Sequence, residues 1–279
     1  VSFDLEAGQC VALLGHNGAG KTTLIRMILA LTPLGSGEIK VLGGMPGSAR
    51  ARRSIGFLPE SVAFHSSLTG REQLHHFARL KSTATAKADQ LLERVGLKEA
   101  ADRKIRTYSK GMRQRIGLAQ ALLGQPKLVL LDEPTSGLDP ISRHEFYDIV
   151  DELAKAGSAV LLSSHALTEL ETRTDRIVIL SKGRLVANDD LAALRQSAQL
   201  PVRIQVKTSP ETVDEVAQKL GGVRVNGHAV AMSCLQNEKL ASLARITALG
   251  NIIRDVDVTP ASLEELYRHF SGIEGEAPR

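Results

Sequence analysis

The fold is decided by one stretch, Gly15-His16-Asn17-Gly18-Ala19-Gly20-Lys21-Thr22, which fits G-x-x-x-x-G-K-S/T at every fixed position. It lies between an apolar run at residues 10–14 and a helical apolar pattern at residues 23–29. Glycines let successive backbone N–H groups point into one hollow at a helix N-terminus, where an anion is favoured. The stretch therefore predicts a phosphate-binding loop. The alternative, a glycine-rich turn with a chance lysine, would not be expected between a strand and a helix.

Composition limits the remaining possibilities. The chain has 279 residues, enough for one large and one smaller domain, and its 43% hydrophobic content supports a core. A net charge of +4 with both signs mixed along the chain does not require a nucleic-acid partner, and we expect none. Cys10 and Cys234 lie far apart, so we expect a reduced compartment and no disulfide framework. No apolar run approaches the ~20 residues that span a bilayer, so any membrane role is expected to come through a partner.

The first 199 residues alternate between α/β and helical patterns. The expected strands are residues 2–5, 10–14, 38–42, 54–58, 128–131, 159–163 and 176–180. The expected helices are residues 23–29, one that opens with a capping box at Thr69 and Glu72, and residues 88–95, 112–123, 142–156 and 167–171. Strands that alternate with helices predict a mostly parallel sheet, interrupted by a helical subdomain at about residues 61–124.

Residues 200–279 are expected to form a separate domain. A strand at 202–206 precedes a helix that we expect to begin with Pro210 at its first position. Residues 223–225 and 229–232 indicate a hairpin around Asn226-Gly227, and a helix at 238–249 and a strand at 252–258 follow. A capping box at Ser262 and Glu265 opens the last helix. The order β-α-β-β-α-β-α predicts a small ferredoxin-like domain.

A pair of acidic residues, Asp132-Glu133, follows the apolar run at 128–131. A carboxylate at the end of a buried strand beside a phosphate loop is well placed to hold Mg²⁺, usually through water. Glu133 is placed to polarise an attacking water. Such a pair alone is common after strands, but here Pro134-Thr135-Ser136-Gly137-Leu138-Asp139 follows it directly.

Together these motifs resemble an ABC-type ATPase, the nucleotide-binding subunit of ATP-binding-cassette transporters, over residues 1 to about 190. The resemblance implies that ATP and Mg²⁺ bind at the Walker A loop, with Asp132 as the Walker B aspartate. It implies catalytic roles for Lys21, Glu133 and the switch histidine His165. The residues implied to contact the nucleotide are Gly15, His16, Asn17, Gly18, Ala19, Gly20, Lys21, Thr22, Thr23, Glu60, Ser109, Gly111 and Asp139, and those implied at the metal are Thr22, Glu60 and Asp132.

The chain departs from the family pattern in three places. Tyr108-Ser109-Lys110-Gly111-Met112 occupies the position of the L-S-G-G-Q signature and keeps only its serine and its second glycine. Glu60 stands where the family usually has a glutamine, and an ionised carboxylate cannot donate a hydrogen bond. The aromatic residue on which adenine stacks in the family is expected before Val1, because Phe3 is interpreted as strand core.

The resemblance also implies partners. Two chains would close over two ATP molecules, with Ser109 and Gly111 of one chain acting on the ATP held by the other. Hydrolysis would remove the γ-phosphate contacts and reopen the homodimer. The region from Glu60 to Arg79 would dock an integral membrane permease at the cytoplasmic face of the bacterial inner membrane.

Residues 58–62, 77–81, 108–115 and 200–204 resemble the ATPase of the copper-processing transporter that serves nitrous oxide reductase maturation. That resemblance implies a periplasmic copper-pathway partner, with copper or a sulfur species handled outside this chain. His75 and His76 are not expected to share a metal ion, because adjacent helix positions diverge by about 100°. Two alternatives stay open: an exporter of a drug, lipid or polysaccharide, and a soluble ATPase of the same family that acts on nucleic acid or ribosomes. The cargo and the role of the second domain also stay open.

Overall fold

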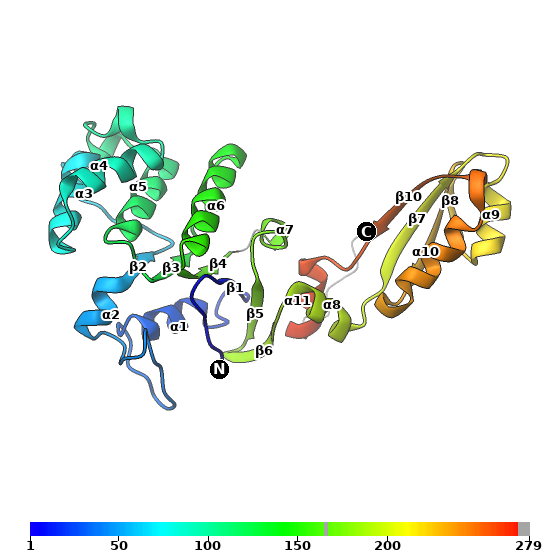
Figure 1. Cartoon of the computed structure of the whole chain (residues 1–279), viewed down its shortest axis with the longest axis horizontal. Helices are drawn as coiled ribbons and strands as arrows, with labels where there is room; N and C mark the ends of the chain where they lie inside the picture. Colours follow the sequence, from blue (N-terminus) through cyan, green and yellow to red (C-terminus); the bar gives the residue numbers. More distant parts are fainter. Residues whose placement is uncertain (165–166, 273–279) are drawn as a thin grey trace. The chain divides into compact units, whose positions relative to one another are not determined.

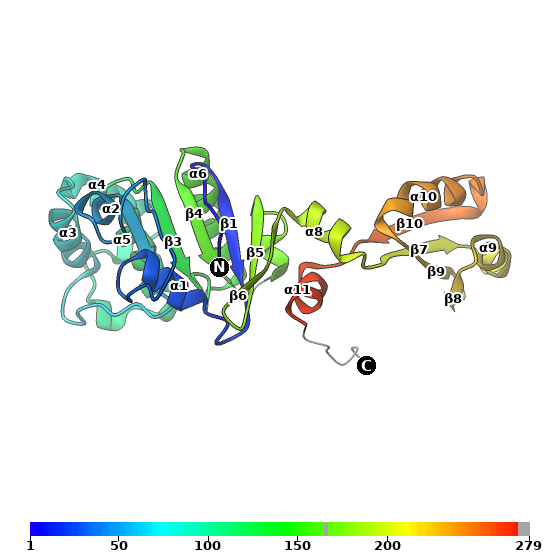
Figure 2. The ribbon, with the colours of Figure 1, turned by 90° about the horizontal axis from the view of Figure 1, so that it is seen from below.

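The computed structural model describes residues 1–164 and 167–272. The chain divides into two compact units, one ending at Asn188 and one beginning at Asp189. Figures 1 and 2 show the ribbon from two directions. Of the helices in these ranges, none combines the length and the apolar composition that crossing a bilayer requires.

The first unit contains a six-stranded sheet in the order β2-β3-β4-β1-β5-β6. Its central pairs are parallel, which confirms the prediction from the alternating pattern. Helices α1 and α6 lie on opposite sides of the sheet in Figure 1, which explains why the central strands are apolar throughout. The strands are β1 (Cys10–Leu14), β2 (Ile55–Leu58), β3 (Leu128–Asp132), β4 (Ala159–Ser163), β5 (Arg176–Ser181) and β6 (Arg184–Asp189), and the helices beside them are α1 (Lys21–Ile28), α2 (Ala49–Ser54), α6 (Pro140–Lys155) and α7 (Leu167–Leu170).

The register of the central strands gathers their carboxyl ends at one edge of the sheet. Ser163 pairs with Leu13 of β1 on one side and with Asp132 of β3 on the other. Figure 2 shows β3, β4 and β1 side by side in this order. The loop that leaves β1 therefore begins beside the acidic pair that ends β3.

The helical subdomain consists of α3 (Gly70–Leu80), α4 (Thr85–Arg94) and α5 (Lys110–Leu122), with short 3₁₀ turns at Lys98–Ala100 and Ile105–Thr107. The predicted capping box of α3 is confirmed, with Thr69 and Glu72 bonded reciprocally to each other's backbone N–H. Helix α5 packs closely on β2 because each of the two elements has a glycine at the contact, Gly117 in α5 and Gly56 in β2. A Cβ on Gly56 would lie 2.2 Å from the Ala121 carbonyl oxygen, and one on Gly117 would lie 2.7 Å from Leu58 Cδ1.

Two predicted strands are wrong. Neither residues 2–5 nor residues 38–42 form a strand, and in the latter only Val41 makes an isolated bridge, to Gly44. Their apolar side chains, including Phe3, Leu5 and Ile39, nevertheless pack against the core of the first unit. The apolar pattern correctly indicated that these side chains pack on the core, but a strand also needs a neighbouring backbone with which it can pair. The pattern also missed α2, β6 and the helix α8 of the second unit.

The second unit has a four-stranded antiparallel sheet in the order β10-β7-β9-β8. The predicted hairpin is confirmed, because Asn226 and Ala229 pair at the ends of β8 and β9. The capping box of Ser262 and Glu265 is also confirmed. The elements are α8 (Leu191–Ala198), β7 (Val202–Thr208), α9 (Val213–Leu220), β8 (Val223–Asn226), β9 (Ala229–Cys234), a 3₁₀ turn (Gln236–Glu238), α10 (Lys239–Thr247), a second 3₁₀ turn (Gly250–Ile252), β10 (Ile253–Thr259) and α11 (Leu263–Ser271).

The predicted start of the helix that follows β7 is wrong. Helix α9 begins at Val213 with Thr212 as its N-cap, so Pro210 lies in the preceding turn and not in the helix. The Thr212 N–H donates to the Ser209 carbonyl oxygen at 3.1 Å, and the hydroxyls of Ser209 and Thr212 lie 2.9 Å apart. These local serine and threonine bonds offer the backbone an alternative to a helical turn.

Candidate functional site

The loop between β1 and α1 is shaped by its glycines. Gly20 is the N-cap of α1 with φ 105°, a conformation that a residue with a Cβ rarely adopts. A Cβ on Gly15 would lie 2.7 Å from Ala19 Cβ and 2.9 Å from the Leu180 carbonyl oxygen. No side chain caps the start of α1, so its first backbone N–H groups keep their hydrogen-bonding capacity for an anion.

Lys21 is folded back over this loop. Its side chain is buried, and Nζ donates to the Gly15 carbonyl oxygen at 2.5 Å. Nζ also lies 4.0 Å from Oε1 of Glu133. The ammonium therefore stands between the phosphate-type loop and the acidic pair, where it can neutralise negative charge brought by a ligand.

Asp132 is the centre of a short chain of hydrogen bonds. Thr22 Oγ1 donates to Asp132 Oδ2 at 2.9 Å, and Ser163 Oγ donates to Asp132 Oδ1 at 2.7 Å. The same Ser163 Oγ accepts from the Glu133 backbone N–H at 3.0 Å. The sequence analysis missed Ser163, because a single serine at the end of a strand is not a motif.

Glu133 has an unusual backbone. Its φ is +48°, in the left-handed region that a non-glycine residue occupies at an energetic cost. Such strain is often found at functional sites, where the surrounding structure holds it in place. Here the bond from the Glu133 N–H to Ser163 is one such restraint, and the Glu133 carboxylate lies 4.0 Å from Lys21 Nζ.

The oxygens of Thr22 and Asp132 fit a magnesium ion, because a hydroxyl and a buried carboxylate that already touch are the hard ligands this ion prefers. Glu60 lies exposed in the turn after β2. It makes no hydrogen bond or ion pair to any residue that the structure describes. No group of three or more His, Cys, Asp or Glu side chains arranged to hold a metal occurs in residues 1–164 and 167–272.

Ser109 and Gly111 lie at the start of α5, away from these contacts. Ser109 is the exposed N-cap, and its Oγ accepts from the Met112 N–H at 3.1 Å. Neighbouring Lys110 donates from Nζ to Ser136 Oγ at 3.1 Å, and a Cβ on Gly111 would lie 3.4 Å from Leu138 Cδ2. The start of α5 thus packs on the loop that follows Glu133 in the same chain.

Asp139 closes that loop as the N-cap of α6. It accepts from the Ser142 N–H at 3.0 Å and from the Ser142 hydroxyl, and these donors hold the pKa of its carboxyl below its usual range. Arg115 of α5 donates to the same Ser142 hydroxyl. Helix α5 is consequently bonded to the loop through Lys110 and to the first turn of α6 through Arg115.

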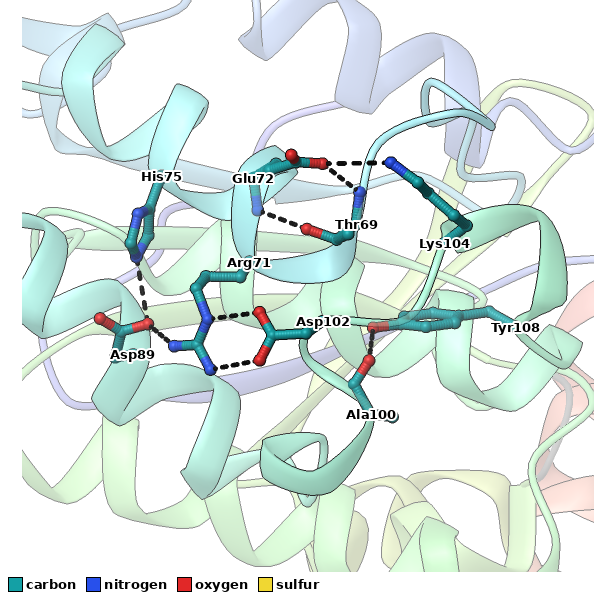
Figure 3. Close-up of polar contacts among 9 residues, drawn as sticks. All are labelled: Thr69, Arg71, Glu72, His75, Asp89, Ala100, Asp102, Lys104 and Tyr108. Atoms are coloured by element: carbon teal, nitrogen blue, oxygen red, sulfur yellow. Dashed lines mark hydrogen bonds and ion pairs between the residues drawn. The ribbon is translucent and has the colours of Figure 1, made fainter.

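A second polar network joins α3 to α4 and to the segment that precedes Ser109 in the sequence (Figure 3). The Arg71 guanidinium donates to both carboxylate oxygens of Asp102, at 2.8 and 3.1 Å, and to Asp89 of α4. These bonds raise the pKa of Arg71 and lower that of Asp102. His75 Nε2 lies 3.1 Å from Oδ1 of Asp89, so its ring points at a carboxylate. The sequence analysis did not anticipate this network.

His165, the predicted switch histidine, lies outside the described residues. The residues immediately before it, Ser163 and Ser164, are buried. The structure therefore brings together Lys21, Thr22, Asp132 and Glu133, leaves Glu60 exposed, and places Ser109 and Gly111 on a separate helix start.

Comparison with known proteins gives consistent similarities. The family model described as ABC transporter matches residues 1–136. The uncharacterized ABC transporter ATP-binding protein YhcH of Bacillus subtilis (strain 168) is 35% identical over 277 residues, which cover 98% of this chain and 90% of that protein. The linearmycin resistance ATP-binding protein LnrL of the same organism is 34% identical over 288 residues, covering 98% of this chain and 92% of that protein. A solved structure of the ATP binding subunit of an ABC transporter has a TM-score of 0.67 and 32% identity, covering 71% of this chain and 85% of that one.

Proposed function

The chain belongs to the family of ABC transporter ATP-binding proteins, whose ATP hydrolysis is coupled to transport, and we propose that it works as one half of a homodimer that drives a membrane permease. The observation that carries the proposal is the contact chain from Thr22 through Asp132 and Ser163 to Glu133, with Lys21 beside it. The phosphate-type loop is thus in contact with two carboxylates: Asp132 accepts hydrogen bonds from hydroxyls, and Glu133 faces the Lys21 ammonium.

Each group in this cluster has a distinct role in the proposal. The loop N–H groups and Lys21 bind the β- and γ-phosphates of ATP. Thr22 and Asp132 hold Mg²⁺, with Glu60 as a further oxygen ligand, and the ion when bound neutralises charge on the phosphate oxygens. Glu133 accepts a hydrogen bond from the attacking water and takes up its proton. His165 contacts the γ-phosphate.

Ser109, Gly111 and Asp139 act at the interface of the homodimer. The exposed Ser109 and the first N–H groups of α5 meet the γ-phosphate of the ATP held by the second subunit. Asp139, at the end of the loop on which α5 packs, lies in the same interface. Two ATP molecules close the dimer, and hydrolysis releases it.

The second unit is a ferredoxin-like accessory domain in this proposal. Its support is the element order β-α-β-β-α-β together with the antiparallel sheet order β10-β7-β9-β8, in which the first and third strands are central. A structural role is the simplest assignment, because α9, α10 and the sheet share one apolar core.

The permease is proposed to dock on residues 60–79, which places the protein peripherally at the cytoplasmic face of the bacterial inner membrane.

For the cargo we propose copper processing in nitrous oxide reductase maturation, with a periplasmic copper-pathway partner. Its support is confined to the stretches at residues 58–62, 77–81, 108–115 and 200–204. A second candidate is a role in resistance like that named for LnrL, supported by similarity over 92% of that protein.

One purification tests these assignments. The tagged protein is isolated from detergent-solubilised membranes, and its partners are identified by mass spectrometry. A permease with a periplasmic copper-pathway protein supports the first cargo, and a permease of another kind rejects copper but keeps the transporter. Recovery only from the soluble fraction, with nucleic acid or ribosomes, would overturn the permease assignment.

A further inference from the structure

Ser109 is preceded by a segment, residues 98–108, that we call the strap because its backbone is bonded to the start of α3. The Arg71 N–H donates to the Ala101 carbonyl oxygen at 2.8 Å. The Ile105 N–H donates to the Leu68 carbonyl oxygen at 2.9 Å, and Thr69 pairs with Lys104 between these two bonds. The strap ends one residue before Ser109, so little free backbone separates that serine from α3.

Arg71 adds a side-chain clamp to this backbone pairing. Its guanidinium binds both oxygens of Asp102 in the strap, and its third nitrogen binds Asp89 in α4 (Figure 3). A planar guanidinium that binds two carboxylates fixes both their distance and their orientation relative to the helix that carries the arginine, which a lysine cannot do. The strap, α3 and α4 are therefore held together at one residue.

Tyr108 fixes the other end of the strap. It is 2% exposed, and its hydroxyl donates to the Ala100 carbonyl oxygen at 2.7 Å, while its N–H donates to Ile105 at 2.9 Å. A Cβ on Gly70 would lie 2.2 Å from that hydroxyl, so only glycine at the first residue of α3 leaves room for the tyrosine. The residue before Ser109 is thus fixed through both its backbone and its side chain.

We propose that Arg71 and Tyr108 are positioning residues that set the place of Ser109 relative to α3, so that a displacement of α3 moves the Ser109 hydroxyl with it. The inference rests on the proposed function, in which Ser109 acts on ATP held by the second subunit. Because residues 60–79 are the proposed permease contact, the strap would connect the permease to the partner's nucleotide site. Neither residue touches ATP, and both act through Ser109.

The experiment uses mixed dimers that contain one complete site. A Lys21→Ala subunit supplies an intact Ser109, and a Ser109→Arg subunit supplies an intact phosphate loop. Tyr108→Phe or Arg71→Lys is then added to one subunit or to the other. Added to the Lys21→Ala subunit, Tyr108→Phe should lower kcat roughly three- to tenfold, the equivalent of one hydrogen bond, and Arg71→Lys should lower it by at least as much.

The same changes added to the Ser109→Arg subunit should leave kcat within about twofold of the value for the mixture without them. The reason is that the strap of that subunit serves no complete site. Lys98→Gln is the matched control, since it removes an exposed charge whose ion pair is with Glu93 and not with α3. ADP affinity of each single variant should stay unchanged, and any loss of Tm should be the same in the two placements, so that stability cannot explain a difference between them. Equal loss of activity in both placements, or no loss in either, would overturn the inference. Failure of the unmodified mixture to hydrolyse ATP would instead overturn the proposed dimer, and the inference with it.

Discussion

The hydroxyl of Thr22 donates a 2.9 Å hydrogen bond to the carboxylate of Asp132, across 110 residues of sequence. The bond joins the first turn of α1 to the last residue of β3, so two of the proposed magnesium ligands, Thr22 and Asp132, are already in contact in the folded chain. The second oxygen of the same carboxylate accepts from Ser163. These two ligands are preorganised, because they need not be brought together when the ion binds.

Ser163→Ala should weaken magnesium binding and slow turnover, but it should leave both Thr22 and Asp132 in place. Removing the hydroxyl deletes the bonds to Asp132 and to the Glu133 N–H, and each is worth about 1 kcal/mol. We expect kcat to fall roughly tenfold and the Mg²⁺ concentration for half-maximal activity to rise. Ser158→Ala is the matched control, because that buried hydroxyl donates only to the Pro126 carbonyl oxygen. An unchanged Mg²⁺ dependence in Ser163→Ala would contradict this account.

Glu133→Gln should separate ATP binding from hydrolysis. The amide keeps the size of the side chain but cannot take up a proton from water, so turnover should slow by at least about a hundredfold. ATP-bound dimers should then accumulate, as measured by size-exclusion chromatography with light scattering. Normal turnover in this variant would remove Glu133 from the mechanism.

The proximity of the phosphate-type loop to the acidic pair could be predicted from the sequence, because both are local motifs with strong context. Residues 15–22 and the pair Asp132-Glu133 each follow a buried strand, and parallel strands bring their carboxyl ends to one edge. Ser163 could not be weighed in this way, because a single serine at a strand end carries no motif. Its importance comes from the register between β3 and β4, which only the structure supplies.

The failures have a common physical cause. Residues 2–5 and 38–42 show the apolar pattern of strands, yet burial of Phe3 and Ile39 does not require a paired backbone. Likewise the Arg71 clamp could not be predicted, because Arg71 contacts Asp89 and Asp102, which are 18 and 31 residues away in the sequence. Periodicity describes each segment by itself, whereas pairing and side-chain clamps are properties of two segments.

A mixture of two inactive variants should recover activity. Ser109→Arg blocks the surface offered to the second subunit, and Lys21→Ala removes the charge for the phosphates in its own loop. If Ser109 acts on the partner's nucleotide, half of the sites in a mixed dimer are doubly defective and half are intact. We expect ATPase activity in the mixture and little in either variant alone. No recovery would count against a dimer in which each subunit completes the other's site.

Gly15→Ala should strain the phosphate-type loop. The new Cβ would lie 2.9 Å from the Leu180 backbone oxygen, which cannot move as a side chain does. We expect a loss of about 1–3 kcal/mol in the free energy of unfolding, measured in urea, and weaker ADP binding. Gly35→Ala is the control, because a Cβ there meets nothing within 4 Å. Equal stability of the two variants would show that the loop relaxes without cost.

Cys10 should make the stability of the protein fall in alkaline solution. Burial raises the pKa of its thiol from 9.0 to about 12, with smaller contributions from Asp175 and Asp151. Between these values the unfolded chain loses the thiol proton and the folded chain keeps it, so the free energy of unfolding decreases as the pH rises. The contribution approaches about 1.4 kcal/mol per pH unit within this window and vanishes below it. Urea unfolding at about pH 8 and about pH 10 should therefore show a smaller loss for Cys10→Ala than for the unmodified protein, and equal losses would exclude this thiol as the cause.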